Sequence, residues 1–521
     1  MIKNKKLFGI EPNIENAVLL SFIILSLVIS LFPFQYGYFR DELYYISLSK
    51  HLAFGYVDVP PLMPFCMVIM RFFFGESLFA IHILPAIFGA ATLVITREIV
   101  KKLGGKLFAQ TLTLLCLTLA PITISHFSRI LYDCFDHLFW ALCLYSLVSL
   151  ITSKNKKYWI YFGIFAGLGL MSKFGMLWLG FGVFLAMIFT PERKYFAAWQ
   201  FWLGGIIALL ILSPYLVWIV EHQFLTIEYL VKYAQSTAPL TIWNFIYLQI
   251  LSLNPLSSPV WALGIYYFIF HQEGRKFRLF GFTYIIIFIV CLIQQAKFYM
   301  IIPLFPVLFA GGAILIEKIT QKFRALYFIW IGYALLIAII DILMVPRVRP
   351  VLPVDTLIKY LNFTHLYQSG RKADTEKFTL GILPQDFADC FGWEEMTAEV
   401  AKIYYSLPKD QRANTFIVTQ NYGEASAIDF YAAKYHLPMP ISQHLQYYVW
   451  GYRNVNENST IIAIGYHINS LKLKSGFKEV KQVGEIYNKY AIPGEKDPIY
   501  LCRGFKKPLK DGWEQGKNMG M

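Results

Sequence analysis

The sequence predicts an α-helical polytopic membrane protein with a C-terminal α/β domain outside the membrane. Of the 521 residues, 57% are hydrophobic and only 15% are charged, a balance that ordinary soluble domains do not have. Apolar stretches long enough to cross a hydrocarbon core recur as far as residue 345. After residue 345 the apolar content falls and charged residues become frequent. We therefore expect a transmembrane domain at residues 1–345 and an extracytoplasmic domain at 346–521.

Eleven apolar segments are predicted to be transmembrane helices. They cover residues 15–33, 78–100, 107–125, 129–152, 158–172, 174–190, 201–220, 255–271, 279–293, 300–316 and 325–345. The first segment has no small-residue cleavage site, so we expect it to stay as an anchor.

The basic residues between these segments predict the topology. They form six clusters, at residues 3–6, 101–106, 154–157, 193–194, 275–278 and 318–324. All six fall on one side of the membrane if the eleven spans are accepted, which is the positive-inside pattern. The N-terminus is then cytoplasmic and the C-terminal domain lies outside. Because the basic residues lie in short loops between apolar segments, the net charge of +14 does not indicate a nucleic-acid partner.

The C-terminal domain shows alternating strand and helix patterns, which indicate a small α/β fold. We expect strands at 378–382, 415–419 and 460–464, and helices at 393–407 and 424–435. Residues 421–424, Asn-Tyr-Gly-Glu, follow a strand and open a helix. That position often binds ligands in α/β sheets, and a turn followed by a helix-stabilising carboxylate explains it equally well.

The cysteines indicate no metal or redox motif, because no paired metal spacing, CxxC, HExxH, Walker or GxGxxG pattern is present. Cys390 and Cys502 share the outer domain and could form a disulfide. Since the sequence does not fix their distance, two buried thiols are the favoured interpretation.

Carboxylates follow the first apolar segment directly. Asp41 and Glu42 lie in the stretch Tyr38–Tyr45, and Asp58 follows in a second loop. Acidic groups at a membrane surface are costly unless they are solvated or paired, so they indicate a functional site. A solvated acidic loop is the alternative.

Isolated cations occur among aromatic residues at the same predicted face. Arg129 with Asp133, Lys173, and Lys297 with Tyr299 all lie at outer ends of spans. Cations at this depth suit an anionic lipid head group such as phosphate. The alternatives are snorkelling of each long side chain to the interface and, for Arg129, an ion pair with Asp133 at i+4.

Three motifs together resemble those of the GT-C membrane glycosyltransferases. They are Arg-Asp-Glu-Leu-Tyr-Tyr at 40–45, Gly-Tyr-Val-Asp-x-Pro-Pro-Leu at 55–62, and Lys-Phe-Tyr-x-x-x-Pro-Leu-Phe-Pro at 297–306. The chain is most similar to the bacterial branch of glycosyltransferase family 39, the dolichyl-phosphate-mannose–protein mannosyltransferase-like proteins. The resemblance covers roughly residues 15–345.

The resemblance implies transfer of a sugar from a polyprenyl-phosphate donor to an acceptor hydroxyl, with inversion, at the outer face of the bacterial inner membrane. Asp41 would be the catalytic base, with Glu42 beside it. The more distant aminoarabinose transferases have an acidic-Lys-Pro sequence, of which Asp58 matches the acidic position while Val59 replaces the lysine.

The donor phosphate would therefore need another cation. Arg129 and Lys297 rank above Lys173 for that role, and Arg40, Asp133 and Tyr299 are further substrate-binding candidates. The family often uses a divalent metal ion, which Asp41 and Asp58 could share through their oxygens.

A lipid or sugar transporter is the main alternative to transfer. Transporters usually show repeated halves and broken spans at matching positions, and this chain shows neither. A non-enzymatic scaffold for envelope assembly would make no use of the acidic loop.

Overall fold

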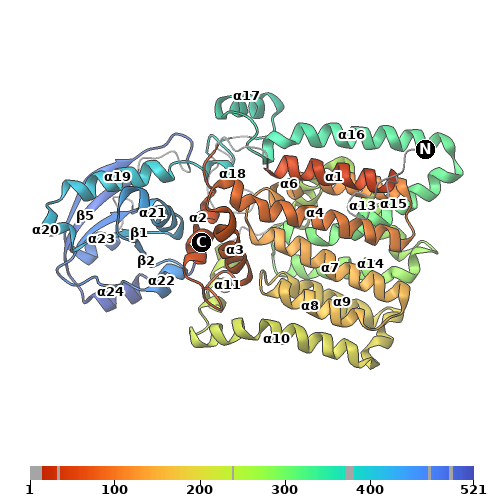
Figure 1. Ribbon diagram of the computed structural model, residues 1–521, viewed down its shortest axis with the longest axis horizontal. Coiled ribbons are helices and arrows are strands. Elements are labelled where there is room, and N and C mark those ends of the chain that lie inside the picture. The colour runs from red at the N-terminus through yellow and green to blue at the C-terminus, as the bar shows by residue number, and fades with distance from the viewer. Residues whose placement is uncertain are drawn as a thin grey trace. The chain divides into compact units, whose positions relative to one another are not determined.

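The computed structural model describes residues 14–31, 36–236, 240–367, 369, 381–466, 471–491 and 497–520. The chain forms two compact units (Figure 1). A helical unit comprises Met1–Pro33, Phe79–Leu216 and Pro239–Val351. A mixed unit comprises Phe34–Leu78, Val217–Ala238 and Leu352–Met521, so two earlier stretches group with the C-terminal residues.

The helical unit contains long and short helices. They are α1 (Ile14–Leu31), α4 (Leu78–Leu103), α5 (Leu107–Thr118), α6 (Pro121–Phe127), α7 (Tyr132–Ser153), α8 (Tyr158–Leu170), α9 (Met176–Ile188), α10 (Trp199–Glu221), α12 (Ile242–Ser252), α13 (Ser258–Ile269), α14 (Arg278–Ile293), α15 (Phe305–Lys322) and α16 (Arg324–Val348). Four 3₁₀ helices join them: η1 (Pro191–Ala197), η2 (Pro255–Ser257), η3 (Gly274–Phe277) and η4 (Phe298–Leu304).

Among the described residues, seven helices are long and apolar enough to cross a membrane, and nine if each of two bent pairs is one span. The pairs are α5 with α6, bent by 67°, and α9 with η1, bent by 106°. Pro121 and Pro191 begin the second member of each pair, where a missing N–H is tolerated. The chain is a multi-span membrane protein.

Each of the eleven predicted spans contains a helix, but two of these helices, α8 and α13, are short and belong to neither bent pair. The helix α8 has 13 residues and α13 has 12. At about 1.5 Å per residue each reaches roughly 20 Å, less than the ~30 Å hydrocarbon core. Length therefore supports seven to nine spans rather than eleven.

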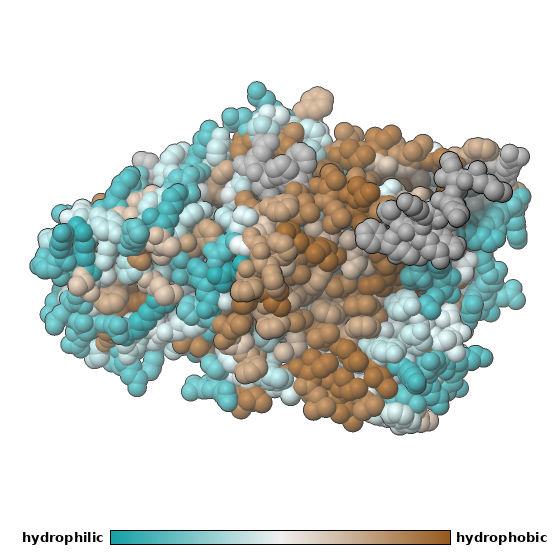
Figure 2. Space-filling model, in the orientation of Figure 1, coloured by the Kyte–Doolittle hydropathy of each residue, from teal (hydrophilic) through white to brown (hydrophobic). Residues whose placement is uncertain are grey.

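Burial separates the spans into inner and outer ones. In α15 and α7, 89% and 83% of the apolar window is buried, against 6% in α1 and 11% in α16. Hydrophobic side chains form a broad band on the visible surface of this unit, and hydrophilic residues lie at the far ends of its helices (Figure 2). Close backbone contact holds α13 to α15, because a Cβ on Gly264 or Gly312 would lie within 2 Å of a carbonyl oxygen on the other helix.

The mixed unit has a five-stranded sheet in the order β2-β1-β3-β5-β4. Its strands are β1 (Thr415–Thr419), β2 (Ile441–Ser442), β3 (Thr460–Ile464), β4 (Phe477–Ile486) and β5 (Asp497–Phe505). The strands β2 and β3 pair parallel to β1, while β5 pairs antiparallel to β3 and β4. The predicted strands 415–419 and 460–464 are confirmed. Of the predicted strand 378–382, residues 378–380 lie outside the described residues, and residues 381–382 are not in a strand.

The helices of this unit come from all three of its stretches. They are α2 (Arg40–Lys50), α3 (Leu62–Phe74), α11 (Leu225–Ser236), α17 (Val354–Thr364), α18 (Gln385–Ala388), α19 (Trp393–Ser406), α20 (Lys409–Arg412), α21 (Tyr422–Tyr435), α22 (Gln446–Trp450), α23 (Leu471–Gly476) and α24 (Leu509–Gln515). The two helices predicted in the C-terminal domain are confirmed as α19 and α21.

The core of the mixed unit joins α2 to the sheet. Leu43 of α2 is fully buried in a cluster with Ile417 of β1, Ala427 of α21 and Ile462 of β3. The acidic loop therefore folds as part of this α/β unit. Cys390 and Cys502 belong to different clusters and are free, buried thiols, so the interpretation as two buried thiols is confirmed.

Candidate functional site

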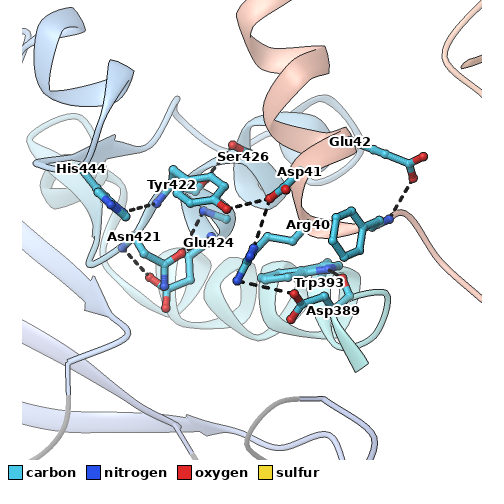
Figure 3. A network of polar contacts seen from close by, with 12 residues as sticks. Arg40, Asp41, Glu42, Asp389, Trp393, Asn421, Tyr422, Glu424, Ser426 and His444 are labelled. Atoms are coloured by element: carbon cyan, nitrogen blue, oxygen red, sulfur yellow. Dashed lines mark hydrogen bonds and ion pairs between the residues drawn. The ribbon is translucent and has the colours of Figure 1, made fainter. Parts of the chain in front are cut away.

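The acidic stretch after α1 forms the first turn of α2. Phe39 precedes the helix with extended backbone angles, and its N–H donates to Glu42 Oε2 at 3.0 Å. Carboxylates in a first turn are stabilised by the free N–H groups and the helix dipole. Glu42 is buried, with 1% of its surface exposed, and points away from Asp41 (Figure 3). Its observed contact caps the helix rather than assisting its neighbour.

Asp41 is held by two donors that converge on one oxygen. The Tyr422 hydroxyl donates to Asp41 Oδ1 at 2.7 Å, and Arg40 Nε donates to the same atom at 3.3 Å (Figure 3). Bonds to an ionised carboxylate are among the stronger ones in proteins. Within the described part of the chain, Oδ2 accepts no hydrogen bond, and the Asp41 side chain is 23% exposed. This carboxylate is oriented yet still accessible.

Arg40 links Asp41 to a second carboxylate. Its Nη1 lies 3.5 Å from Asp389 Oδ2, and its backbone N–H donates to the Asp389 carbonyl at 3.1 Å. Its guanidinium also lies 5.4 Å from the centre of the Tyr422 ring. Arg40 was predicted to bind substrate, and in the structure its side chain contacts Asp41, Asp389 and Tyr422.

Tyr422 is fixed by the start of α21. Asn421 Oδ1 accepts the N–H groups of Gly423 and Glu424, and Glu424 accepts those of Gln420 and Asn421, which is a capping box. The interpretation of residues 421–424 as a helix start is therefore confirmed. Burial also raises the pKa of Tyr422, so its phenol keeps the proton that it donates to Asp41.

His444 supports the Tyr422 backbone. Burial lowers the pKa of His444 to about 4, so the ring is neutral near pH 7. Its Nδ1 accepts the Tyr422 N–H at 3.2 Å, and its Nε2 lies 2.5 Å from the Gly520 carbonyl oxygen. Nothing in the sequence near Asp41 pointed to Tyr422, Asp389 or His444.

Asp58 lies in the same site as Asp41. The Tyr44 hydroxyl donates to Asp58 Oδ1 at 2.7 Å, and the Tyr44 and Tyr422 ring centres are 4.8 Å apart. Burial is the main cause that raises the pKa of Asp58 to about 7, and the charge of Asp41 also raises it. The hydrogen bond from Tyr44 lowers the pKa but does not offset burial. The predicted pair Asp41 and Asp58 is thus connected through two tyrosines whose rings are in contact and tilted by 50°.

The two carboxylates do not form a cation site. Within the described ranges no group of three or more His, Cys, Asp and Glu side chains could hold a metal ion. Asp41 Oδ1 and Asp58 Oδ1 each accept a hydrogen bond from a tyrosine hydroxyl. A hard divalent ion needs about six oxygen ligands, more than these two carboxylates supply. Asp41 and Asp58 therefore do not fit a shared metal ion.

A second polar cluster lies at the start of α7 in the helical unit. Lys173 Nζ is 2.6 Å from Asp133 Oδ1 and 3.9 Å from Asp136 Oδ2. The same ammonium group lies 4.8 Å and 5.3 Å from the ring centres of Tyr132 and Tyr299. The structure thus brings together three predicted residues, Asp133, Lys173 and Tyr299, although the sequence ranked Lys173 last.

The ion pair between Arg129 and Asp133 was predicted because the two residues were expected at i and i+4 of one helix, and the structure does not have this arrangement. Because α7 begins at Tyr132, Arg129 precedes the helix and the two residues do not share a helical face. Arg129 is 4% exposed, while Lys173 and Lys297 are each 8% exposed. Snorkelling of these cations to water is therefore wrong. His126 Nδ1 and His137 Nε2, 2.9 Å apart, form a further buried pair that the sequence did not indicate.

The comparisons with known proteins agree with this architecture. Residues 58–218 match the family model of dolichyl-phosphate-mannose-protein mannosyltransferase, so the predicted resemblance is confirmed over this range. It includes Asp58, Arg129, Asp133 and Lys173 and begins after Asp41. No curated protein sequence matches the chain.

Two solved structures of ArnT show the same fold. ArnT from Cupriavidus metallidurans, bound to undecaprenyl phosphate, matches with a TM-score of 0.59 and 13% identity, covering 93% of this chain and 97% of ArnT. Its apo state matches with a TM-score of 0.60 at the same identity and coverage. The oligosaccharyltransferase of Archaeoglobus fulgidus gives 0.49 at 12% identity, covering 82% and 64% of the two chains. The chain therefore has an ArnT-like GT-C fold, as predicted.

Proposed function

We propose that this protein is a membrane glycosyltransferase that moves a sugar from a polyprenyl-phosphate donor to an acceptor hydroxyl. The observation that carries the proposal is the oriented, partly exposed carboxylate of Asp41 in a chain with the ArnT-like fold. The family match at residues 58–218 and the undecaprenyl phosphate named for ArnT support the same class of donor.

Asp41 is the general base in this proposal. Tyr422 and Arg40 bind Oδ1, which leaves Oδ2 to accept the proton of the acceptor hydroxyl as its oxygen attacks the anomeric carbon. The bond from the anomeric carbon to the donor phosphate breaks, and the lipid phosphate leaves. With one base and no covalent nucleophile, the sugar is transferred with inversion.

The departing lipid phosphate gains negative charge, which needs a fixed cation. Arg129, Lys173 and Lys297 of the helical unit are the candidates, and all three are buried. The sequence ranked Arg129 and Lys297 above Lys173 as phosphate ligands, and Lys173 forms an ion pair with Asp133.

We further propose that the protein lies in the bacterial inner membrane with the N-terminus in the cytoplasm. The six basic clusters of the sequence support this orientation if all eleven predicted segments cross the membrane. Asp41 and the C-terminal residues would then be outside, where polyprenyl-phosphate sugars serve as donors. Reporter fusions at residues 155 and 521 should give opposite location signals, and equal signals would contradict the orientation.

A transfer assay with the purified protein tests the activity. Membrane extracts that contain polyprenyl-phosphate sugars supply the donors, and mass spectrometry of envelope glycans from a deletion strain identifies the acceptor. We expect Asp41→Asn to lower turnover by about two to four decades, because a positioned base contributes that much. The variant keeps the size of the side chain, so donor binding should change little.

Glu42→Gln is the matched control. Since Glu42 caps α2, this variant should affect stability more than turnover. Full activity in Asp41→Asn would remove Asp41 from the mechanism and make Asp58 the next candidate base. Donor movement across the bilayer by a protein without any transfer activity would instead support a flippase.

A further inference from the structure

The two faces of the sheet in the mixed unit are covered unequally. Side chains alternate along each strand, so neighbouring residues of β1 and β3 face opposite sides. Ile417 and Ile462 face the helices α19 and α21, which have 14 residues each. Val418 and Ala463 belong to the other face, where the covering helices α23 and α24 have only 6 and 7 residues.

This thin cover leaves a cavity of about 280 Å³ on the second face. Its size is close to the lower end of the ~300–1,000 Å³ that ligand pockets usually have. A Cβ built on Gly476, in its wall, would meet no atom within 4 Å, which indicates open space there. A void of this size accommodates one hydrocarbon chain rather than two.

The lining is apolar and aromatic. Val418, Ile461 and Ala463 of the strands meet Tyr466, Phe477 and Trp513 across the cavity. The described residues that line it include no Asp or Glu. A hydrocarbon tail would therefore be desolvated in it without leaving a buried acidic group unpaired.

The chemistry at the edge of this cavity is cationic. Lys507 lines it and is exposed, with its Nζ donating to Gln515 Oε1 at 2.9 Å. In the covering segments, residues 473–476 and 506–515, exposed lysines outnumber exposed acids: Lys474, Lys506, Lys507 and Lys510 against Asp511 and Glu514. An apolar cavity with positive charge at its edge matches an amphiphile with a negative head group.

We propose that this cavity binds a single-chain lipid with an anionic head group, such as a fatty acid. The tail occupies the cavity and the carboxylate lies at Lys507. The inference does not depend on the transferase activity, because none of the residues around Asp41 lines the cavity.

Photolabelling of the full-length protein tests this. The protein is placed in phosphatidylcholine nanodiscs with a twelve-carbon carboxylic acid that carries a terminal diazirine. We expect labelled peptides from residues 452–466 and 505–513, and competition by excess laurate. Lys507→Gln should reduce labelling by the acid and leave labelling by the matching twelve-carbon alcohol unchanged.

Two variants fill the cavity, and one serves as a control. Ala463→Leu and Val418→Phe place larger side chains in it and should each reduce labelling at least about tenfold. If Ala463→Leu does not fold, Val418→Phe still decides the result. Ala433→Leu changes an exposed residue of α21 and should label like the wild type.

Labelling confined to the membrane-spanning helices would overturn the proposal. So would equal labelling of both filled variants and the wild type. Equal labelling of the wild type by the acid and the alcohol would contradict the anionic head group. Stronger labelling by a diazirine phosphatidylglycerol than by the acid would contradict a single-chain ligand.

Discussion

Asp41 of the mixed unit and Asp133 of the helical unit are both held by strong polar contacts, but of different kinds. Asp133 forms an ion pair with Lys173 in which both side chains are about nine-tenths buried. Asp41 binds a neutral phenol and an arginine that is shared with Asp389, and its side chain is 23% exposed. Asp133 is thus committed to its partner, whereas Asp41 keeps an oxygen for a further proton. This difference is consistent with the proposed role of Asp41 as the base and with a structural role for Asp133.

The largest effect on stability should come from breaking the buried pair. Lys173→Met leaves Asp133 and Asp136 without their ammonium partner, and loss of one member of a buried pair typically costs about 3–5 kcal/mol. We expect a clear fall in the thermal midpoint of the purified protein. Arg193→Met, which changes an exposed residue, is the control and should have little effect.

A double variant separates pairing from donor binding. Lys173→Met with Asp133→Asn removes both charges and should recover most of the lost stability. If donor affinity recovers as well, Lys173 acts only as a structural partner. Stable protein in Lys173→Met alone would show that Asp133 does not depend on Lys173.

Donor affinity should respond to the other two cations. Arg129→Ala or Lys297→Ala removes a charge-assisted contact to phosphate, which is worth on the order of 1.5–3 kcal/mol, or about one to two decades of affinity. Binding of a polyprenyl phosphate to each variant measures the loss. Unchanged affinity in both variants would move the phosphate site to Lys173 and contradict a purely structural role for the pair that Lys173 forms with Asp133.

Local patterns in the sequence were sufficient for much of this fold. Long apolar runs predicted helices. The strands 415–419 and 460–464 were predicted because they are mostly buried, and their sequences are therefore mostly apolar. The strand β4 was missed because its residues are mostly polar and exposed, and β2 because it has only two residues. The short spans were overestimated because apolar composition does not show where a helix ends.

The acidic residues of the candidate site could be predicted from the sequence, but their partners could not. Asp41 and Asp58 were visible because acidic groups next to an apolar segment are unusual. Their partners depend on distant contacts: Tyr422 lies 381 positions from Asp41, and Lys173 lies 40 positions from Asp133. A single sequence contains no signal for such pairs. The sequence likewise did not show that Lys173 contacts Asp133 and Asp136, because these contacts form only in the folded chain.

Tyr422→Phe tests whether the C-terminal residues position the base. The variant removes the hydroxyl that binds Asp41 and keeps the ring that packs on Tyr44. Loss of this hydrogen bond should lower kcat roughly tenfold and leave the KM for donor nearly unchanged. Tyr448→Phe, whose ring stacks on Trp513, is a matched control that should keep full activity. Wild-type turnover in Tyr422→Phe would show that Arg40 alone orients Asp41.

Asp58 differs from Asp41 in its cost to stability. Its pKa rises from an ordinary value of 3.8 to about 7 in the folded protein, chiefly through burial. Between these values the folded state holds a proton that the unfolded state has lost, so stability falls as the pH rises and levels off above about pH 7.

Asp58→Asn removes this cost and keeps an oxygen for the Tyr44 hydroxyl. At pH 3 the variant and the wild type should unfold at nearly the same temperature, because Asp58 is largely neutral in both states there. At pH 8 the variant should be more stable, by about 2–4 °C for each kcal/mol removed. Glu424, whose pKa burial also raises to about 7, and His444, whose pKa is lowered to about 4, contribute equally to both proteins and cancel in the difference. Asp410→Asn, at an exposed position, should show no such dependence on pH. A difference in unfolding temperature that stays constant from pH 3 to pH 8 would mean that Asp58 is solvated in the folded protein. Its connection to Asp41 through Tyr44 would then be contradicted.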